Sequence, residues 1–84
     1  MNESRERYPI HEAQQVISDR VTSGSSVLGI AGVWVVGDDV RPDPQYVADL
    51  DPGGSNDPAA LADLLAGWPQ DESFCVEIEF ARPH

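Results

Sequence analysis

The stretch that decides the fold runs from Val27 to Val36 and reads Val-Leu-Gly-Ile-Ala-Gly-Val-Trp-Val-Val. All its residues are apolar or glycine, and β-branched side chains are frequent among them. A run that is apolar on both sides predicts a central strand covered on two faces. Gly29 and Gly32 allow another segment to approach the strand closely, or they mark a bulge. The rest of the chain must therefore supply neighbours for a central strand.

A second, shorter strand is predicted at residues 45–50, after a connection that begins with the turn at residues 37–39. Pro42 and Pro44 predict that this connection is irregular. The two strands together form a hairpin with a loose loop. One face of the shorter strand carries Tyr46, Ala48 and Leu50, and the other carries Gln45, Val47 and Asp49.

Two helices are predicted from apolar residues that recur at spacings of three and four. The first covers residues 9–22, with Pro9 at its first position. The second follows Asp57, a strong N-cap, with Pro58 in its first turn and Gly67 at its end. The apolar stripes are Ile10, Ala13, Ile17 and Val21 in the first helix, and Leu61, Leu64, Leu65 and Trp68 in the second.

The last predicted strand, residues 74–81, alternates without a break. This period of two is typical of a strand with one buried and one solvated face. The inward set is Phe74, Val76, Ile78 and Phe80, and the outward set is Cys75, Glu77 and Glu79.

These elements follow the order α-β-β-α-β and predict one small α+β domain over residues 9–81, with tails at 1–8 and 82–84. We expect a three-stranded sheet with both helices on one face. The crossover between the strands at 45–50 and 74–81 is expected to be right-handed and to place them parallel. The order resembles a ferredoxin-like fold that lacks its first strand, a resemblance that implies a fold and no function. A missing strand leaves a sheet edge that must be covered, twisted away or paired with another chain.

The charge of the chain is one-sided, with fifteen acids against five arginines and a formal net charge of -10 over 84 residues. Most of the acids lie in residues 38–79, where Arg41 is the one base, whereas residues 1–24 are close to neutral. Such a surface repels phosphate backbones and anionic membranes, so nucleic acid and membranes are disfavoured as direct ligands. We expect the partner to be a basic protein surface.

The single cysteine, Cys75, excludes an intramolecular disulfide and fits a reducing compartment. The N-terminus is charged and has no apolar run behind it, so a signal peptide is not expected. The longest apolar stretch, residues 27–36, is too short to span a bilayer as a helix. We therefore expect a cytoplasmic protein.

No motif typical of catalysis stands out, and we expect that the chain is not an enzyme and holds no cofactor or metal. Residues 49–57 resemble the start of a calcium-binding loop. The position at which such a loop needs a bidentate glutamate is occupied by Ala60. A helix N-cap preceded by a glycine turn explains the same residues. Asp38 and Asp39 fit a polar turn better than an acid–base pair. The nearby carboxylates of Glu77 and Glu79, on the same predicted face, disfavour Cys75 as a thiolate nucleophile.

Our first hypothesis is a non-enzymatic interaction module that engages a basic partner; its concrete version is an inhibitor or regulator that mimics nucleic-acid phosphates. The alternative is a small structural or accessory domain that dimerises through a sheet edge and is acidic for solubility or salt adaptation. Trp34 and Trp68 fit the core stripes, and either becomes an interface anchor if it is exposed. The residues expected to contact the partner are Asp38, Asp39, Asp43, Asp49, Asp51, Glu77, Glu79 and Trp34.

Overall fold

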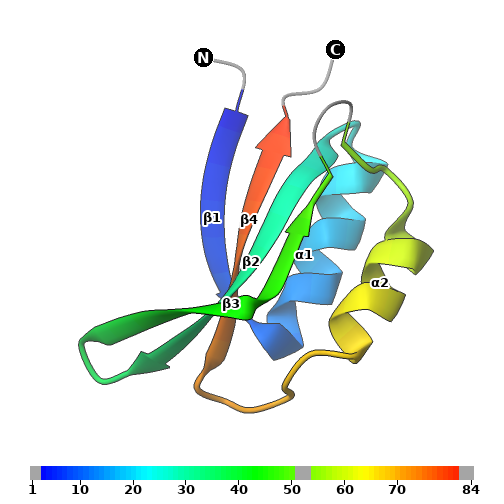
Figure 1. The fold of residues 1–84 in the computed structure, drawn as a ribbon. Coiled ribbons are helices and arrows are strands. Elements are labelled where there is room, and N and C mark those ends of the chain that lie inside the picture. Colours follow the sequence, from blue (N-terminus) through cyan, green and yellow to red (C-terminus); the bar gives the residue numbers. More distant parts are fainter. Residues whose placement is uncertain (1–2, 51–53, 82–84) are drawn as a thin grey trace.

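The structure is a computed structural model that describes residues 3–50 and 54–81. Asp51 and the expected tail at residues 82–84 lie outside these ranges. Figure 1 shows one twisted sheet with both helices packed on the same face, so the predicted α+β class is confirmed. The elements of the described residues are β1 (Glu3–Pro9), α1 (Ile10–Thr22), β2 (Ser26–Val36), β3 (Asp39–Asp49), α2 (Pro58–Ala66) and β4 (Phe74–Ala81).

Within the described residues the sheet has four strands in the order β1-β4-β2-β3, and each neighbouring pair is antiparallel. β1 and β2 therefore run parallel with β4 between them, and β3 and β4 run parallel with β2 between them. The expectation of three strands was wrong. The parallel direction of β3 and β4 agrees with the expectation, but the two strands are not neighbours. The likeness to a ferredoxin-like chain remains one of element order along the chain.

The additional strand, β1, comes from residues that the sequence analysis assigned to an N-terminal tail. Its residues carry no apolar alternation, because Arg5 and Arg7 point to one face of the sheet and Glu6 to the other. The strand pairs along its whole length with β4, from Glu3 opposite Ala81 to Pro9 opposite Cys75. Backbone hydrogen bonds to β4 hold β1 at this edge, and among its side chains Tyr8 packs against the core.

The core lies between the helices and one face of the sheet. It contains Ile10, Ala13, Ile17, Val27, Ile30, Leu61, Leu65, Trp68, Phe74, Val76, Ile78 and Phe80. The predicted inward set of β4 is confirmed, since each of its side chains is at most 1% exposed. Asp57 caps α2 as predicted, because its Oδ1 accepts from the backbone N–H groups of Ala59 and Ala60. No helix within the described ranges is long and apolar enough to cross a membrane.

The hairpin between β2 and β3 is longer than the sequence suggested. β3 begins at Asp39, not at Gln45, and the connection is the tight turn at Gly37 and Asp38. Pro42 and Pro44 lie inside the strand, which is possible because β3 is an edge strand whose outer N–H groups need no partner. The register with β2 shifts between the pairs Ala31–Val47 and Val33–Pro42, so β3 bulges at residues 43–46.

β2 is central, as predicted, but the described helices cover one of its faces and not two. Its helix-facing row includes Ile30, Gly32 and Trp34, opposite Ile78, Val76 and Phe74 of β4. The other row, Ala31, Val33 and Val35, lies on the face of the sheet that no described helix covers, hereafter the open face. Val33 is nonetheless only 2% exposed, whereas Ala31 and Val35 are partly exposed and require an explanation other than burial.

Gly32 marks the closest approach of β2 to the core. A Cβ added there would lie 2.8 Å from Cβ of Tyr46 and would overlap the ring of Phe74. Phe74 cannot move aside, because it is fully buried and makes edge contacts with the rings of Trp34, Tyr46 and Trp68 at 4.9, 5.4 and 6.2 Å. Gly29 in the same strand differs, since its added Cβ would meet only the carbonyl oxygen of Ala48 at 3.5 Å, an ordinary contact.

We therefore expect Gly32→Ala to lower the free energy of unfolding by about 2 kcal/mol through overpacking. The matched variant Gly29→Ala, in the same strand, should change it by less than about 0.5 kcal/mol. Urea unfolding followed by tryptophan fluorescence measures both. Equal effects of the two substitutions would contradict the close packing of Phe74 against Gly32.

Candidate functional site

The open face of the sheet carries a continuous apolar strip along β2 and β3. The strip arises because residues directly opposite each other in an antiparallel pair share a face. Val47, on this face, is 60% exposed, and Val40 is 41% exposed. We call this set the valine strip; its cross-strand pairs are Ala31 with Val47, Val33 with Pro42, and Val35 with Val40. Val33, at its centre, is only 2% exposed, so the exposed part of the strip lies mainly on β3.

Beside the valine strip, the two remaining strands carry alternating charges. On β4, Glu77 and Glu79 face outward as predicted, and β1 places Arg7 and Arg5 directly opposite them. Arg5 Nη2 forms an ion pair of 3.1 Å with Glu79 Oε2. The arginines of β1 therefore neutralise part of the acidity that the sequence pattern assigned to β4.

Between these charges and β3 lies a shallow trough of about 270 Å³. Gly29 and Ala31 of β2 form its floor, because glycine has no side chain and alanine has only a methyl group to fill the space above the sheet. Arg5, Glu77 and Glu79 line one side of the trough, and Val47 and Asp49 line the other. The trough joins the valine strip at Ala31 and Val47, so the two form one continuous surface.

The end of the β2–β3 hairpin extends beyond β4, whose first residue, Phe74, pairs with Trp34 (Figure 1). Asp38 and Asp39 are exposed at its turn. Val36 is 66% exposed and lies on the face opposite the valine strip, next to Trp34 in a pocket of about 450 Å³ that Asp39 and Arg41 complete. The tip of the hairpin therefore presents carboxylates with apolar side chains on both faces.

Trp34 joins the hairpin to the core. Its ring makes an edge contact with Phe74, with 4.9 Å between the centroids, and its Nε1 donates to Oδ2 of Asp43 at 3.0 Å. Oδ1 of Asp43 accepts from the backbone N–H of Gln45 at 3.1 Å, which stabilises the bulge of β3. Trp34 is half-buried, whereas Trp68 lies within the core. Asp43 thus has a structural role in addition to its charge.

Further acids approach the hairpin from the loop between α2 and β4. The backbone N–H of Val35 donates to the carbonyl oxygen of Ser73 at 2.8 Å, which brings this loop to the base of the hairpin. Asp71 and Glu72, the two residues before Ser73, are exposed. We call this region the acidic end; its charged residues are Asp38, Asp39, Arg41, Asp43, Asp71 and Glu72.

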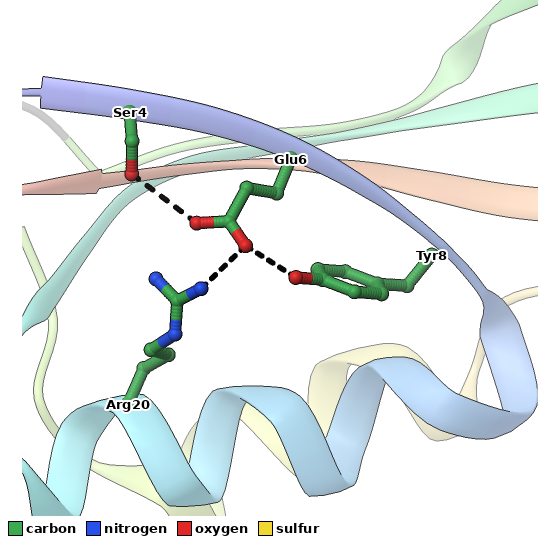
Figure 2. Close-up of polar contacts among 4 residues, drawn as sticks. All are labelled: Ser4, Glu6, Tyr8 and Arg20. Atoms are coloured by element: carbon green, nitrogen blue, oxygen red, sulfur yellow. Dashed lines mark hydrogen bonds and ion pairs between the residues drawn. The ribbon is translucent and has the colours of Figure 1, made fainter.

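A polar cluster on the helix-covered side ties β1 to α1 (Figure 2). Glu6 of β1 accepts hydrogen bonds from the hydroxyl of Tyr8, the guanidinium of Arg20 and, at 3.3 Å, Oγ of Ser4. The Tyr8 hydrogen bond, helped by the positive charge of Arg20, holds the pKa of Glu6 below its ordinary value. The same hydrogen bond raises the pKa of Tyr8. Arg20 also lies over the ring of Phe80, 5.1 Å from its centroid, so the cluster rests on the core.

The arrangement of the other reactive side chains provides no candidate catalytic centre in the described residues. His11 is exposed on α1, and Cys75 lies on the open face, so the sheet separates them. No group of three or more histidine, cysteine or acidic side chains within residues 3–50 and 54–81 is arranged to hold a metal ion. The Asp57 carboxylate of the suspected calcium loop caps α2.

The residues predicted to contact a partner fall into two groups. Asp49, Glu77 and Glu79 line the trough on the open face. Asp38, Asp39, Asp43 and Trp34 belong to the hairpin. Asp51 lies outside the described residues. The sequence analysis did not identify the valine strip or the arginines of β1, although the alternation of Arg5 and Arg7 with Ser4, Glu6 and Tyr8 has the period of a strand.

Comparison with protein-family models, with curated proteins and with solved structures finds no match for this chain. The surface itself is therefore the basis for a functional argument.

The polar cluster makes a prediction about stability. We expect Glu6→Gln to lower the free energy of unfolding at neutral pH by about 1 kcal/mol, because a partly exposed charge-assisted interaction is lost. The lowered pKa of Glu6 means that its contribution is complete above the pKa of the unfolded chain and is lost as the pH falls through the folded-state pKa. The difference between the two proteins should therefore shrink in acid.

Chemical denaturation across the acid range measures this difference. Glu72→Gln is the matched control, because Glu72 is exposed in a loop and its substitution removes the same charge. A Glu6→Gln effect that is no larger than that of Glu72→Gln, or that does not depend on pH, would refute a stabilising role for the cluster.

Proposed function

We propose that this chain is a non-enzymatic protein-interaction module that binds a basic partner protein. The observation that carries the proposal is the position of exposed apolar side chains beside unbalanced carboxylates. Val40 and Val47 are 41% and 60% exposed, and Asp38 and Asp39 lie at the tip of the same hairpin. An exposed apolar patch with charge of one sign at its rim is typical of a surface that another protein covers.

The distribution of charge supports a basic partner. At the acidic end Arg41 is the one base that accompanies the five acids. On the open face, by contrast, Arg5 and Arg7 balance Glu79 and Glu77. The attraction for arginine and lysine side chains is therefore strongest at the hairpin, where it also accelerates association with a positively charged protein.

A narrower form of the proposal is an inhibitor or regulator that occupies the nucleic-acid site of its partner by presenting carboxylates in place of phosphates. Its support comes from Asp38 and Asp39, which are exposed at the turn between β2 and β3. The hairpin formed by these two strands projects from the rest of the sheet in Figure 1. Glu79 forms an ion pair with Arg5 and Glu77 lies opposite Arg7, which leaves those two less suited to mimicry. Such a protein would act in the cytoplasm, where its free thiol, Cys75, stays reduced.

The alternative proposal is a structural or accessory domain that dimerises through a sheet edge. The edge formed by β3 is poorly suited to this role, because Pro42 and Pro44 lack N–H groups and the strand bulges beside them. The edge formed by β1, over Glu3–Pro9, is the better candidate in the described sheet. Sedimentation of the purified protein distinguishes a dimer of this kind from a monomer that awaits its partner.

The acidic end predicts how binding responds to charge. With an arginine-rich peptide as the probe, Asp38→Lys combined with Asp39→Lys should weaken binding about tenfold or more at low salt. The control combines Glu12→Lys with Asp63→Lys, two exposed acids on the helices, and makes the same change in net charge. Titration by fluorescence anisotropy measures both, in low salt and in about 0.5 M salt.

The control pair should weaken binding several-fold less than the hairpin pair, and salt should weaken the wild-type complex steeply. Equal losses of affinity for the two double variants would contradict a special role of the acidic end. Absence of binding to the wild-type protein at low salt would refute the proposed function itself.

A further inference from the structure

We infer that the pocket at the tip of the β2–β3 hairpin receives one large apolar side chain of the basic partner, preferably an aromatic ring, with lysine or arginine on either side of it. The inference rests on the proposed function, because it names the contact that anchors that partner. The pocket has a volume of about 450 Å³ and is hereafter the tip pocket; its lining residues are Trp34, Val36, Asp39 and Arg41.

Strand pairing brings the residues of the tip pocket together. Val36 lies opposite Asp39, and Trp34 lies opposite Arg41. All four side chains therefore share one face of the hairpin, which is the face opposite the valine strip. β4 begins at Phe74, the residue opposite Trp34, and Figure 1 shows the hairpin extending beyond this point away from both helices. A partner can therefore reach the tip pocket without any rearrangement of the domain.

Trp34 and Val36 form the apolar part of the tip pocket. Nε1 of Trp34 donates to Oδ2 of Asp43 at 3.0 Å, so the polar group of the indole already has its hydrogen bond. The half-buried indole thus offers apolar ring surface to a partner. Val36 is 66% exposed, the highest value among the exposed large apolar side chains of the described residues. Covering this surface with an apolar group removes it from water, which favours association.

Contacts on two sides hold Trp34 in place before a partner arrives. Its ring makes an edge contact with Phe74, which is fully buried. Asp43, which accepts from the indole, also accepts from the backbone N–H of Gln45 and is thereby fixed itself. A side chain that is already ordered loses little conformational entropy on binding. Tryptophan is also frequent among the residues that dominate binding energies, and a second aromatic ring packs well against it.

The charged groups around the tip pocket favour an occupant with basic neighbours. Among the residues that the structure describes, neither Asp39 nor Arg41 takes part in an ion pair. Asp38 is exposed at the adjoining turn, and Asp43 lies against the indole of Trp34. These carboxylates outweigh the single guanidinium beside them. Lysine or arginine residues next to the inserted apolar side chain would therefore be attracted to this end of the hairpin.

Two other occupants fit the tip pocket less well. A free small molecule needs a site that buries most of its surface, whereas the described lining of this pocket comes from one two-stranded hairpin. A second copy would bring two acidic ends together, and each chain carries a formal net charge of -10. An apolar side chain on a larger basic protein needs no such enclosure, because the surrounding interface excludes water from the contact.

The test compares two arginine-rich peptides of equal length and charge, one with a single phenylalanine at its centre and the other with alanine there. Val36→Gln places a polar side chain in the tip pocket without changing the net charge. Thr22→Gln is the matched control, because Thr22 is an exposed β-branched residue at the end of α1, away from the hairpin and the open face. Fluorescence anisotropy at low salt measures the dissociation constant of each combination.

We expect the wild-type protein to bind the phenylalanine peptide about tenfold more tightly than the alanine peptide. Val36→Gln should remove most of this preference while it leaves binding of the alanine peptide within about twofold, and Thr22→Gln should retain the preference. Thermal unfolding verifies that both variants are folded. Arg41→Gln should bind both peptides at least as tightly as the wild-type protein, because it removes a positive charge beside a basic ligand.

The inference is overturned if the wild-type protein binds the two peptides equally, or if Val36→Gln retains the preference for phenylalanine. Loss of affinity in Arg41→Gln would indicate an anionic occupant, and a dimer that Val36→Gln dissociates in sedimentation would identify a second copy; both results also overturn it. In these cases weaker peptide binding by the protein with Asp38→Lys and Asp39→Lys would still support the proposed function. If neither peptide binds the wild-type protein at low salt, both the inference and the proposed function fail.

Discussion

The structure depends on the burial of one face of β4. Phe74, Val76, Ile78 and Phe80 are each at most 1% exposed, beneath both helices. β4 is the last strand of the described chain, yet it lies inside the sheet and pairs with both β1 and β2. The N-terminal strand therefore has no partner until the C-terminal strand is in place. Such long-range pairing costs loop entropy, which the buried row of β4 offsets.

This arrangement of the strands also determines where on the surface the negative charge of the molecule is uncompensated. Because β1 pairs with β4, Arg5 and Arg7 lie opposite Glu79 and Glu77 and reduce the acidity of the open face. The uncompensated carboxylates remain at the acidic end, where the hairpin leaves the sheet. A chain that is acidic over half of its sequence thus becomes a domain with one strongly acidic end and an apolar strip next to it.

Much of the core could be predicted, because it is built from local patterns. The capping of α2 by Asp57 and the alternation of β4 follow from side-chain chemistry and period, and both appear as expected. β1 was missed because its alternation is between charged and polar side chains rather than apolar and polar ones, and because the strand that pairs with it, β4, is far away in the sequence. The early start of β3 was missed because Pro42 is acceptable in an edge strand, and edge position is not visible in the sequence.

For the candidate site, the sequence by itself determined the residue types: acids concentrated in residues 38–79, an apolar central strand, and a last strand with carboxylates on one face. Tertiary structure decided which of these act together. Only strand pairing could place the arginines of β1 beside Glu77 and Glu79, and only the position of both helices on one face could leave the valine strip open. The physical reason is that the period and composition of a segment determine which of its own side chains are buried. The order of the strands in the sheet determines which side chains of different segments come into contact.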